Sequence, residues 1–150
     1  ERRMKKNYPR RALSSDDYRT DQWILDLFPN FFDPCPFKGI HLKHNGLHMS
    51  WNYADYDGVF VNPPYSNPKP WVKKAIQEQK DARRRAYDPE DEQEIWSAGT
   101  IVMLLKHDTS TEWYRLLHEA GAKFLLVNGR LKHQTNKACA FPSVLVVMSL

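Results

Sequence analysis

The sequence has few cysteines and no long apolar run, and each shortage excludes a class of protein. Its 150 residues include two cysteines, Cys35 and Cys139, whose wide spacing favours reduced thiols over a disulfide framework. No apolar run approaches the roughly 20 residues that a membrane-spanning helix needs. The charged N-terminal residues are not followed by an apolar segment, so we expect no secretory signal. These absences predict an intracellular, cytoplasmic protein that does not contact membranes.

The residues that are abundant indicate a globular chain with a basic N-terminus. Hydrophobic residues make up 41% and aromatic residues 13% of the chain, enough for one compact domain with a core. The formal net charge is +4, a mild bias towards polyanionic partners. Much of the positive charge lies at Arg2, Arg3, Lys5, Lys6, Arg10 and Arg11. We predict that residues 1–13 form a flexible basic arm, more as a solvated tail than as a binding arm, and that residues 14–150 form a single domain.

Apolar runs alternate with helix caps, which predicts an α/β fold. Strands are expected at residues 31–32, 59–61, 100–105, 123–127 and 143–150. Residues 38–57 carry little regular signal and are expected to be rich in loops, with one short strand at most. Strands that alternate with helices favour a mainly parallel sheet. No helical pattern separates the last two strands, so the C-terminal strand is predicted to be antiparallel.

Three helices are expected between these strands. Thr20 or Asp21 caps the first, which has an apolar face formed by Trp23, Ile24, Leu27 and Phe28. The second begins at Pro70 and buries Trp71, Val72, Ala75 and Ile76. The third spans residues 109–120 and ends at Gly121.

Polar residues follow two of the predicted strands, where open α/β sheets place their ligands. Asp33 follows the first strand, and Asn62-Pro63-Pro64-Tyr65 follows the strand at residues 59–61. Two prolines cannot continue a sheet ladder, so the second strand ends in a rigid polar corner.

That corner suits chemistry on a planar amino group. The Asn62 side-chain carbonyl and the Pro63 backbone carbonyl can accept both amine hydrogens, while Tyr65 stacks on the ring. Accepting both hydrogens takes the nitrogen lone pair out of conjugation, so that a weak nucleophile can attack a methyl sulfonium. A proline-terminated strand beside a surface tyrosine is the alternative, and we favour the functional interpretation.

Two other clusters carry weaker signals. Cys35, His41, His44 and His48 could form a zinc site, although no Cys-x-x-Cys pair accompanies them, which favours solvated histidines. His107 and Asp108 lie near Ser110 as in a hydrolase fragment, but no nucleophile elbow is present. Asp108 is better explained as the cap of the helix that follows.

Asn62-Pro63-Pro64-Tyr65 matches the catalytic motif of amino-methyltransferases that use S-adenosylmethionine. Further segments, in the same order, resemble the phage-type DNA N-6-adenine methyltransferases (Dam-like) and cover nearly everything after residue 13. They are residues 18–23, 32–35, 46–47 with Trp51, 61–66, 102–105 with Asp108-Thr109, 129–132 and 141–147. The resemblance implies a Rossmann-like methyltransferase fold of reduced size. It also implies methyl transfer from S-adenosylmethionine to the exocyclic amine of adenine in DNA, after base flipping.

The resemblance also implies roles for individual residues. It assigns catalysis to Asn62, Pro63, Pro64 and Tyr65. It assigns cofactor binding to Thr20, Trp23, Asp33, Pro34, Cys35 and Asn45. Arg130 and Lys132 are candidates for contacts with DNA phosphates, and neither a metal nor a covalent intermediate is expected. The chain departs from the family pattern in three of these places. It lacks a glycine-rich loop after Cys35, it has Asp21 where proline is frequent, and it has Asn45 where an acidic residue is common.

Other acceptors and partners stay open at this stage. The methyl acceptor could be RNA or a protein glutamine, although the basic arm favours nucleic acid. The missing glycine-rich loop also suits a non-catalytic DNA-binding module with a decayed cofactor pocket. Double-stranded DNA is the expected partner, and no separate target-recognition domain fits in 150 residues. A homodimer could therefore be needed to cover a duplex, and a phage or prophage origin would place the enzyme in a host cell.

Overall fold

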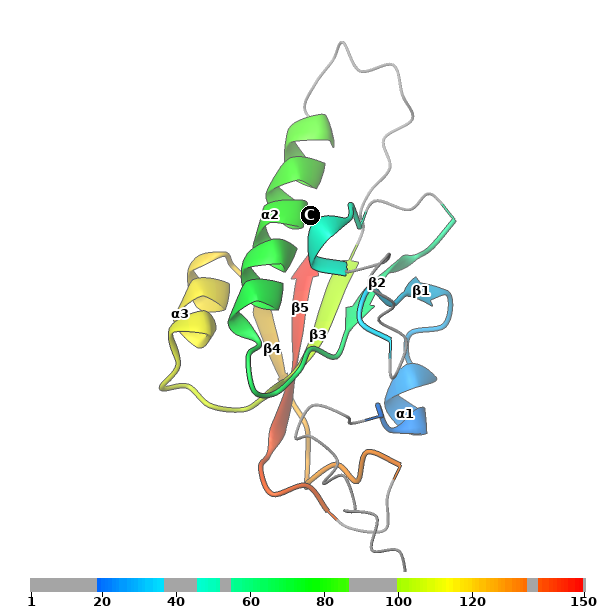
Figure 1. Ribbon diagram of the computed structural model, residues 1–150, viewed down its shortest axis with the longest axis vertical. Coiled ribbons are helices and arrows are strands. Elements are labelled where there is room, and N and C mark those ends of the chain that lie inside the picture. The colour runs from blue at the N-terminus through cyan, green and yellow to red at the C-terminus, as the bar shows by residue number, and fades with distance from the viewer. Residues whose placement is uncertain (1–18, 37–45, 52–54, 87–99, 135–137, 150) are drawn as a thin grey trace, which may run out of the picture.

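The computed structural model describes residues 19–36, 46–51, 55–86, 100–134 and 138–149. The predicted basic arm at residues 1–13 and the candidate ligands His41, His44 and Asn45 lie outside these ranges. Figure 1 shows one twisted sheet with two longer helices against one face and a single-turn helix at the other side.

The sheet has five strands in the order β1-β2-β3-β5-β4. Their bounds are β1 Phe31–Phe32, β2 Gly58–Val61, β3 Thr100–Lys106, β4 Lys123–Leu126 and β5 Ser143–Ser149. Strands β1, β2 and β3 pair in parallel, whereas β5 runs antiparallel to both β3 and β4. Four strands therefore share one direction, and the α/β prediction of a mainly parallel sheet with an antiparallel C-terminal strand is confirmed.

The central strands are buried on both faces, which explains their unbroken apolar sequence. On β3, Ile101, Met103 and Leu105 pack into the core on one face of the sheet. Val102 and Leu104 pack into a second cluster on the other face. Side chains of a strand alternate between faces, so a continuous apolar run fills both cores at once.

Helices α2 (Lys69–Ala86) and α3 (Glu112–Glu119) cover the first face (Figure 1). Trp71, Val72 and Ala75 of α2 are buried there, as predicted. Pro70 lies in the first turn, where a missing N–H removes no helical hydrogen bond. Trp71 stacks on Trp51, with 6.4 Å between ring centroids. Trp51 follows η1 (Gly46–His48), the one-turn 3-10 helix beside α2.

Helix α3 begins three residues later than predicted, and Asp108 is not its cap. Asp108 instead accepts hydrogen bonds from the Ser110 amide at 3.1 Å and from Ser110 Oγ at 2.5 Å, which closes a turn. Thr111 caps the helix, because its Oγ1 accepts from the Tyr114 amide at 3.3 Å. Gly121 follows the helix with a φ of 78°, the left-handed conformation that ends many helices.

Helix α1 (Gln22–Leu25) is a single turn on the second face of the sheet. Ile24 is buried against the cluster that contains Phe60, Val102 and Leu104. Trp23 and Leu27 belong to the predicted apolar face, but they stay 50% and 57% exposed. One turn of helix is too short to bury all of a stripe that was expected to continue to Phe28. Among the described helices, none is both long and apolar enough to cross a membrane.

Candidate active site

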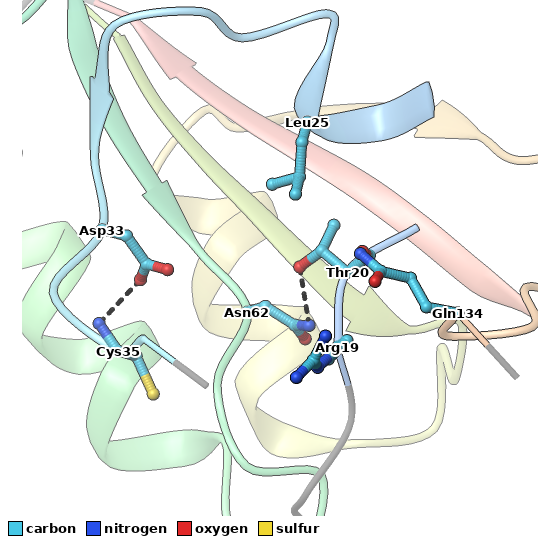
Figure 2. Close-up of a pocket in the computed structure, with 7 residues that line it drawn as sticks. All are labelled: Arg19, Thr20, Leu25, Asp33, Cys35, Asn62 and Gln134. Carbon is cyan, nitrogen blue, oxygen red and sulfur yellow. Dashed lines mark hydrogen bonds between the residues drawn. The ribbon is translucent and has the colours of Figure 1, made fainter. Parts of the chain in front are cut away.

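Polar residues gather at the carboxyl ends of β1 and β2, as the sequence predicts. Asp33 follows β1 and Asn62 follows β2, and the two strands are parallel neighbours. A pocket of about 230 Å³ opens between them (Figure 2). Its lining residues come from four separate parts of the chain and are Arg19, Thr20, Leu25, Asp33, Cys35, Asn62 and Gln134.

The Asn62 amide is held in one orientation by the segment before α1. Its Nδ2 donates a hydrogen bond to Thr20 Oγ1 at 3.0 Å (Figure 2). Its Oδ1 is buried and has no hydrogen-bond partner among the described residues. Buried polar atoms without partners are rare in native proteins and call for an explanation. The bond to Thr20 therefore fixes the Asn62 amide and leaves its Oδ1 as an unused hydrogen-bond acceptor on a residue that lines the pocket.

The rest of the tetrapeptide forms a tight corner around this acceptor. Pro63 is buried, and the Pro64 carbonyl accepts from the Asn67 amide at 3.2 Å. Tyr65 is half-buried, and its ring meets His133 at 5.6 Å and 63° and Phe141 at 4.7 Å and 66°. Both contacts are edge-on, which aromatic rings prefer over direct face-to-face stacking. Tyr65 lies outside the lining of the described pocket, but His133 joins it to Gln134, which is part of that lining.

Asp33 and Cys35 form the wall on the β1 side. Asp33 Oδ1 accepts from the Cys35 amide at 2.8 Å (Figure 2). Asp33 is exposed as a whole, yet surrounding protein reduces the solvation of its carboxyl group and raises its pKa from 3.8 to about 6. Burial and the Asp33 charge raise the pKa of the Cys35 thiol to about 12, so this thiol stays neutral. Cys35 and Cys139 are both free thiols, as the sequence predicts.

Pro34, which stands between Asp33 and Cys35 in the chain, is buried and packs against η1. A Cβ added at Gly46 would lie 2.1 Å from the Pro34 carbonyl oxygen, so only glycine permits this approach. Trp51 Nε1 donates to the Gly46 carbonyl at 2.8 Å and fixes the same turn. The packing of Pro34 against Gly46 thus sets the path of the chain where it leaves β1.

The pocket unites Thr20, Asp33, Cys35 and Asn62 from the predicted site. Trp23 lies outside its lining, and Leu25 of the same helix is present instead. Arg130 and Lys132 are exposed on the segment after β4, where Arg130 Nη1 donates to the Ala140 carbonyl at 2.7 Å. Among the described residues, no group of three His, Cys, Asp or Glu side chains could hold a metal.

Three lining residues were not predicted as site residues from the sequence: Arg19, Leu25 and Gln134. Arg19 directly precedes the predicted Thr20, so the neighbouring position was a weak signal. Gln134 is 114 residues away from Thr20 in the chain, yet its Nε2 donates to the Thr20 carbonyl at 2.7 Å. No local pattern marks such a residue.

Comparison with known proteins identifies the family. A family model described as DNA N-6-adenine-methyltransferase (Dam) matches residues 7–144. A curated relative from Haemophilus phage HP1 (strain HP1c1), named DNA N-6-adenine-methyltransferase, is 32% identical over 133 residues, which cover 81% of this chain and 68% of the relative. No solved structure matches the chain at a significant level. The chain therefore belongs to the DNA N-6-adenine-methyltransferase (Dam) family.

Proposed function

We propose that this protein transfers a methyl group from S-adenosylmethionine to the exocyclic amine of adenine in DNA, with the adenine flipped out of the helix. The observation that carries this proposal is the buried Asn62 Oδ1, which has no partner among the described residues and belongs to a residue that lines the pocket. An acceptor left open at such a position suits a ligand that brings its own N–H group.

Asn62 acts first as an acceptor for the adenine amine. Its Oδ1 accepts one amine hydrogen, and the Pro63 backbone carbonyl is proposed to accept the other. Both bonds become stronger as the amine gains positive charge, so they stabilise the transition state more than the bound substrate. The amine nitrogen would form its bond to the methyl carbon as the bond from that carbon to sulfur breaks, sulfur would leave as a neutral thioether, and the alkylated amine would then lose a proton to water. Catalysis therefore depends on alignment and on two fixed acceptors rather than on a strong base.

Tyr65 supplies the stacking surface for the flipped base. Extruding a base from a duplex costs a few kcal/mol. Stacking on an aromatic side chain returns about 1–3 kcal/mol. The edge contacts from His133 and Phe141 hold the Tyr65 ring before the base arrives, so little side-chain entropy is lost on binding.

The remaining lining residues suit the amino-acid end of S-adenosylmethionine. Arg19 would hold its carboxylate and Asp33 its ammonium, and Thr20 lines the same pocket. When bound, S-adenosylmethionine supplies an electrophilic methyl group on a positively charged sulfur. Leu25 and the neutral Cys35 thiol give the same pocket an apolar part.

The DNA would meet the segment after β4. Arg130 and Lys132 are exposed there, and the chain carries a formal net charge of +4. Cationic side chains on such a segment suit phosphate oxygens, which position a duplex without reading its sequence.

The decisive experiment is the Asn62→Ala variant, with Asn67→Ala as its matched control. Asn67 is an exposed asparagine five positions further along the same corner. Transfer of labelled methyl from S-adenosylmethionine is measured on double-stranded DNA, single-stranded DNA and RNA, and cofactor binding is measured by calorimetry. Asn62→Ala should lower the transfer rate by about a hundredfold or more while cofactor affinity changes little.

Unchanged turnover in Asn62→Ala would refute the assignment of this site. Methyl transfer to RNA but not to DNA would refute DNA as the methyl acceptor and identify RNA instead. A wild-type protein that binds no S-adenosylmethionine would support the decayed DNA-binding module instead.

A further inference from the structure

Two segments that are far apart in the sequence are joined beside the pocket by one carboxylate. Asp21 Oδ2 accepts a hydrogen bond from the Lys132 amide and Asp21 Oδ1 accepts one from the Gln134 amide, both at 3.1 Å. Gln134 Nε2 donates to the Thr20 carbonyl at 2.7 Å, and His133 Nδ1 lies 3.1 Å from the Arg19 carbonyl. We call this set of four contacts between residues 19–21 and 132–134 the Asp21 clasp.

The clasp holds a backbone conformation that these residues do not favour. His133 and Gln134 have φ values of 50° and 58°, in the left-handed region that non-glycine residues rarely adopt. Such a conformation persists only where surrounding contacts determine it. The two amides on either side of His133 both donate to Asp21, so this carboxylate contributes to offsetting the strain.

Asp21 is not explained by a role in α1. It occupies the N-cap position of that helix, yet its side chain makes no capping hydrogen bond there. An aspartate at an N-cap normally accepts from an amide of the first turn. The carboxylate is committed to the distant segment instead, which is unusual for a residue at the start of a helix.

The clasp places His133 against Tyr65. His133 is 3% exposed, and its ring lies edge-on to the Tyr65 ring at 5.6 Å. On the other side, Thr20 follows directly in the chain from Arg19 and holds the Asn62 amide. We propose that Asp21 is a positioning residue that, by clasping residues 132–134, holds His133 against Tyr65 and so sets the ring on which the flipped base stacks. This inference rests on the proposed function of Tyr65.

The first test needs no substrate and follows His133 in the free protein. Burial lowers the pKa of His133, while its contact with the Arg19 carbonyl and the negative charge of Asp21 act in the opposite direction. The variants are Asp21→Ala, Asp21→Asn, which keeps one acceptor, and the control Asp26→Ala. Asp26 is an exposed aspartate five positions further on that contacts Gln22.

Titration of the His133 ring by NMR distinguishes an opened clasp from a closed one, because the pKa of His133 changes in opposite directions in the two cases. If Asp21→Ala opens the clasp, the ring becomes solvated and its pKa rises. If the ring stays buried, loss of the Asp21 charge lowers its pKa further. We expect a rise in Asp21→Ala, a smaller change in Asp21→Asn and no change in Asp26→Ala. A fall or no change in Asp21→Ala would overturn the clasp.

The second test connects the clasp to methyl transfer. Asp21→Ala should lower kcat/KM for DNA by about tenfold to a hundredfold, because a misplacement of the reacting base by about 1 Å can cost about a hundredfold in rate. Asp21→Asn should recover part of that loss, whereas Asp26→Ala should match the wild type. Calorimetry with S-adenosylmethionine is run beside the kinetics, because Arg19, Thr20 and Gln134 of the clasp also line the pocket proposed for the cofactor. The positioning role predicts a loss that persists at saturating S-adenosylmethionine, and a loss that saturation abolishes would refute it.

The two tests separate the possible failures. A raised His133 pKa with unchanged DNA kinetics would show that Asp21 holds residues 132–134 in place, but it would refute the positioning role of Asp21 in methyl transfer. Wild-type protein that methylates no nucleic acid would refute the proposed function, and the positioning role with it. In that case the NMR titration would still decide whether Asp21 holds residues 132–134.

Discussion

Replacing Thr20 with valine should slow methyl transfer, because valine keeps the shape of threonine and removes the hydroxyl group. Thr20 Oγ1 accepts from Asn62 Nδ2 at 3.0 Å, and this bond determines which way the Asn62 amide faces. Without it, the amide can turn and present its NH2 group where an acceptor is needed. The free energy that the bond contributes is then added to the barrier.

The expected size follows from the strength of a neutral hydrogen bond. A net contribution of about 0.5–1.5 kcal/mol corresponds to a rate lowered by about twofold to thirteenfold. Thr20→Ser keeps the oxygen and should stay within about twofold of wild type. A serine that restores the rate separates the hydrogen bond from the packing of the threonine methyl group.

The assay is single-turnover methyl transfer to DNA at saturating S-adenosylmethionine and saturating DNA. Saturation matters because Thr20 also lines the pocket proposed for the cofactor. A rate for Thr20→Val equal to that of Thr20→Ser and wild type would refute the orientation argument. If only the KM for S-adenosylmethionine rises, Thr20 acts on the cofactor and not on Asn62.

Two further predictions concern pH and salt. The pKa of Asp33 is raised from 3.8 to about 6, so between these values the native state binds more protons than the unfolded state and stability falls as pH rises. The Asp33→Asn variant should therefore gain stability relative to wild type between pH 3.8 and about 6, and keep that gain at higher pH. Thermal unfolding at several pH values measures the difference in stability. A variant less stable than wild type would contradict the raised pKa of Asp33. Lys132→Ala should reduce the slope of log affinity for DNA against log salt by about 0.9, the release of about one counterion. Lys123 is an exposed lysine on edge strand β4, and Lys123→Ala should leave the slope unchanged. Equal slopes in the two variants would refute the proposed contact between Lys132 and a DNA phosphate.

The sheet and half of the pocket could be predicted because their signals are local. Val59, Phe60 and Val61 are a continuous apolar run, and such a run is what a strand buried on both faces requires. The prolines after Asn62 end that strand, and the parallel order brings Asp33 to the same edge. Each of these steps uses residues close together in the sequence and one general rule of α/β sheets.

The remaining part of the pocket could not be predicted because long-range contacts decide it. Gln134 reaches the pocket only through left-handed backbone at two non-glycine residues, which local propensities disfavour. Asp21 reads as an N-cap from the sequence, but its carboxylate binds the distant segment. The predicted start of α3 was wrong for a related reason. Asp108 and Thr111 are both residue types that cap helices, and the turn at Ser110 decides between them.

The tetrapeptide motif is therefore only part of the proposed site. Asn62 presents its acceptor because Thr20 holds the other end of its amide. Tyr65 has a set orientation because His133 and Phe141 contact its edges, and Asp21 clasps the segment that carries His133. Thr20 and Asp21 are consecutive, so one short stretch before α1 supports both the acceptor and the stacking ring. A chain that kept Asn-Pro-Pro-Tyr but lost this stretch would keep the motif and lose the geometry on which the proposed chemistry depends.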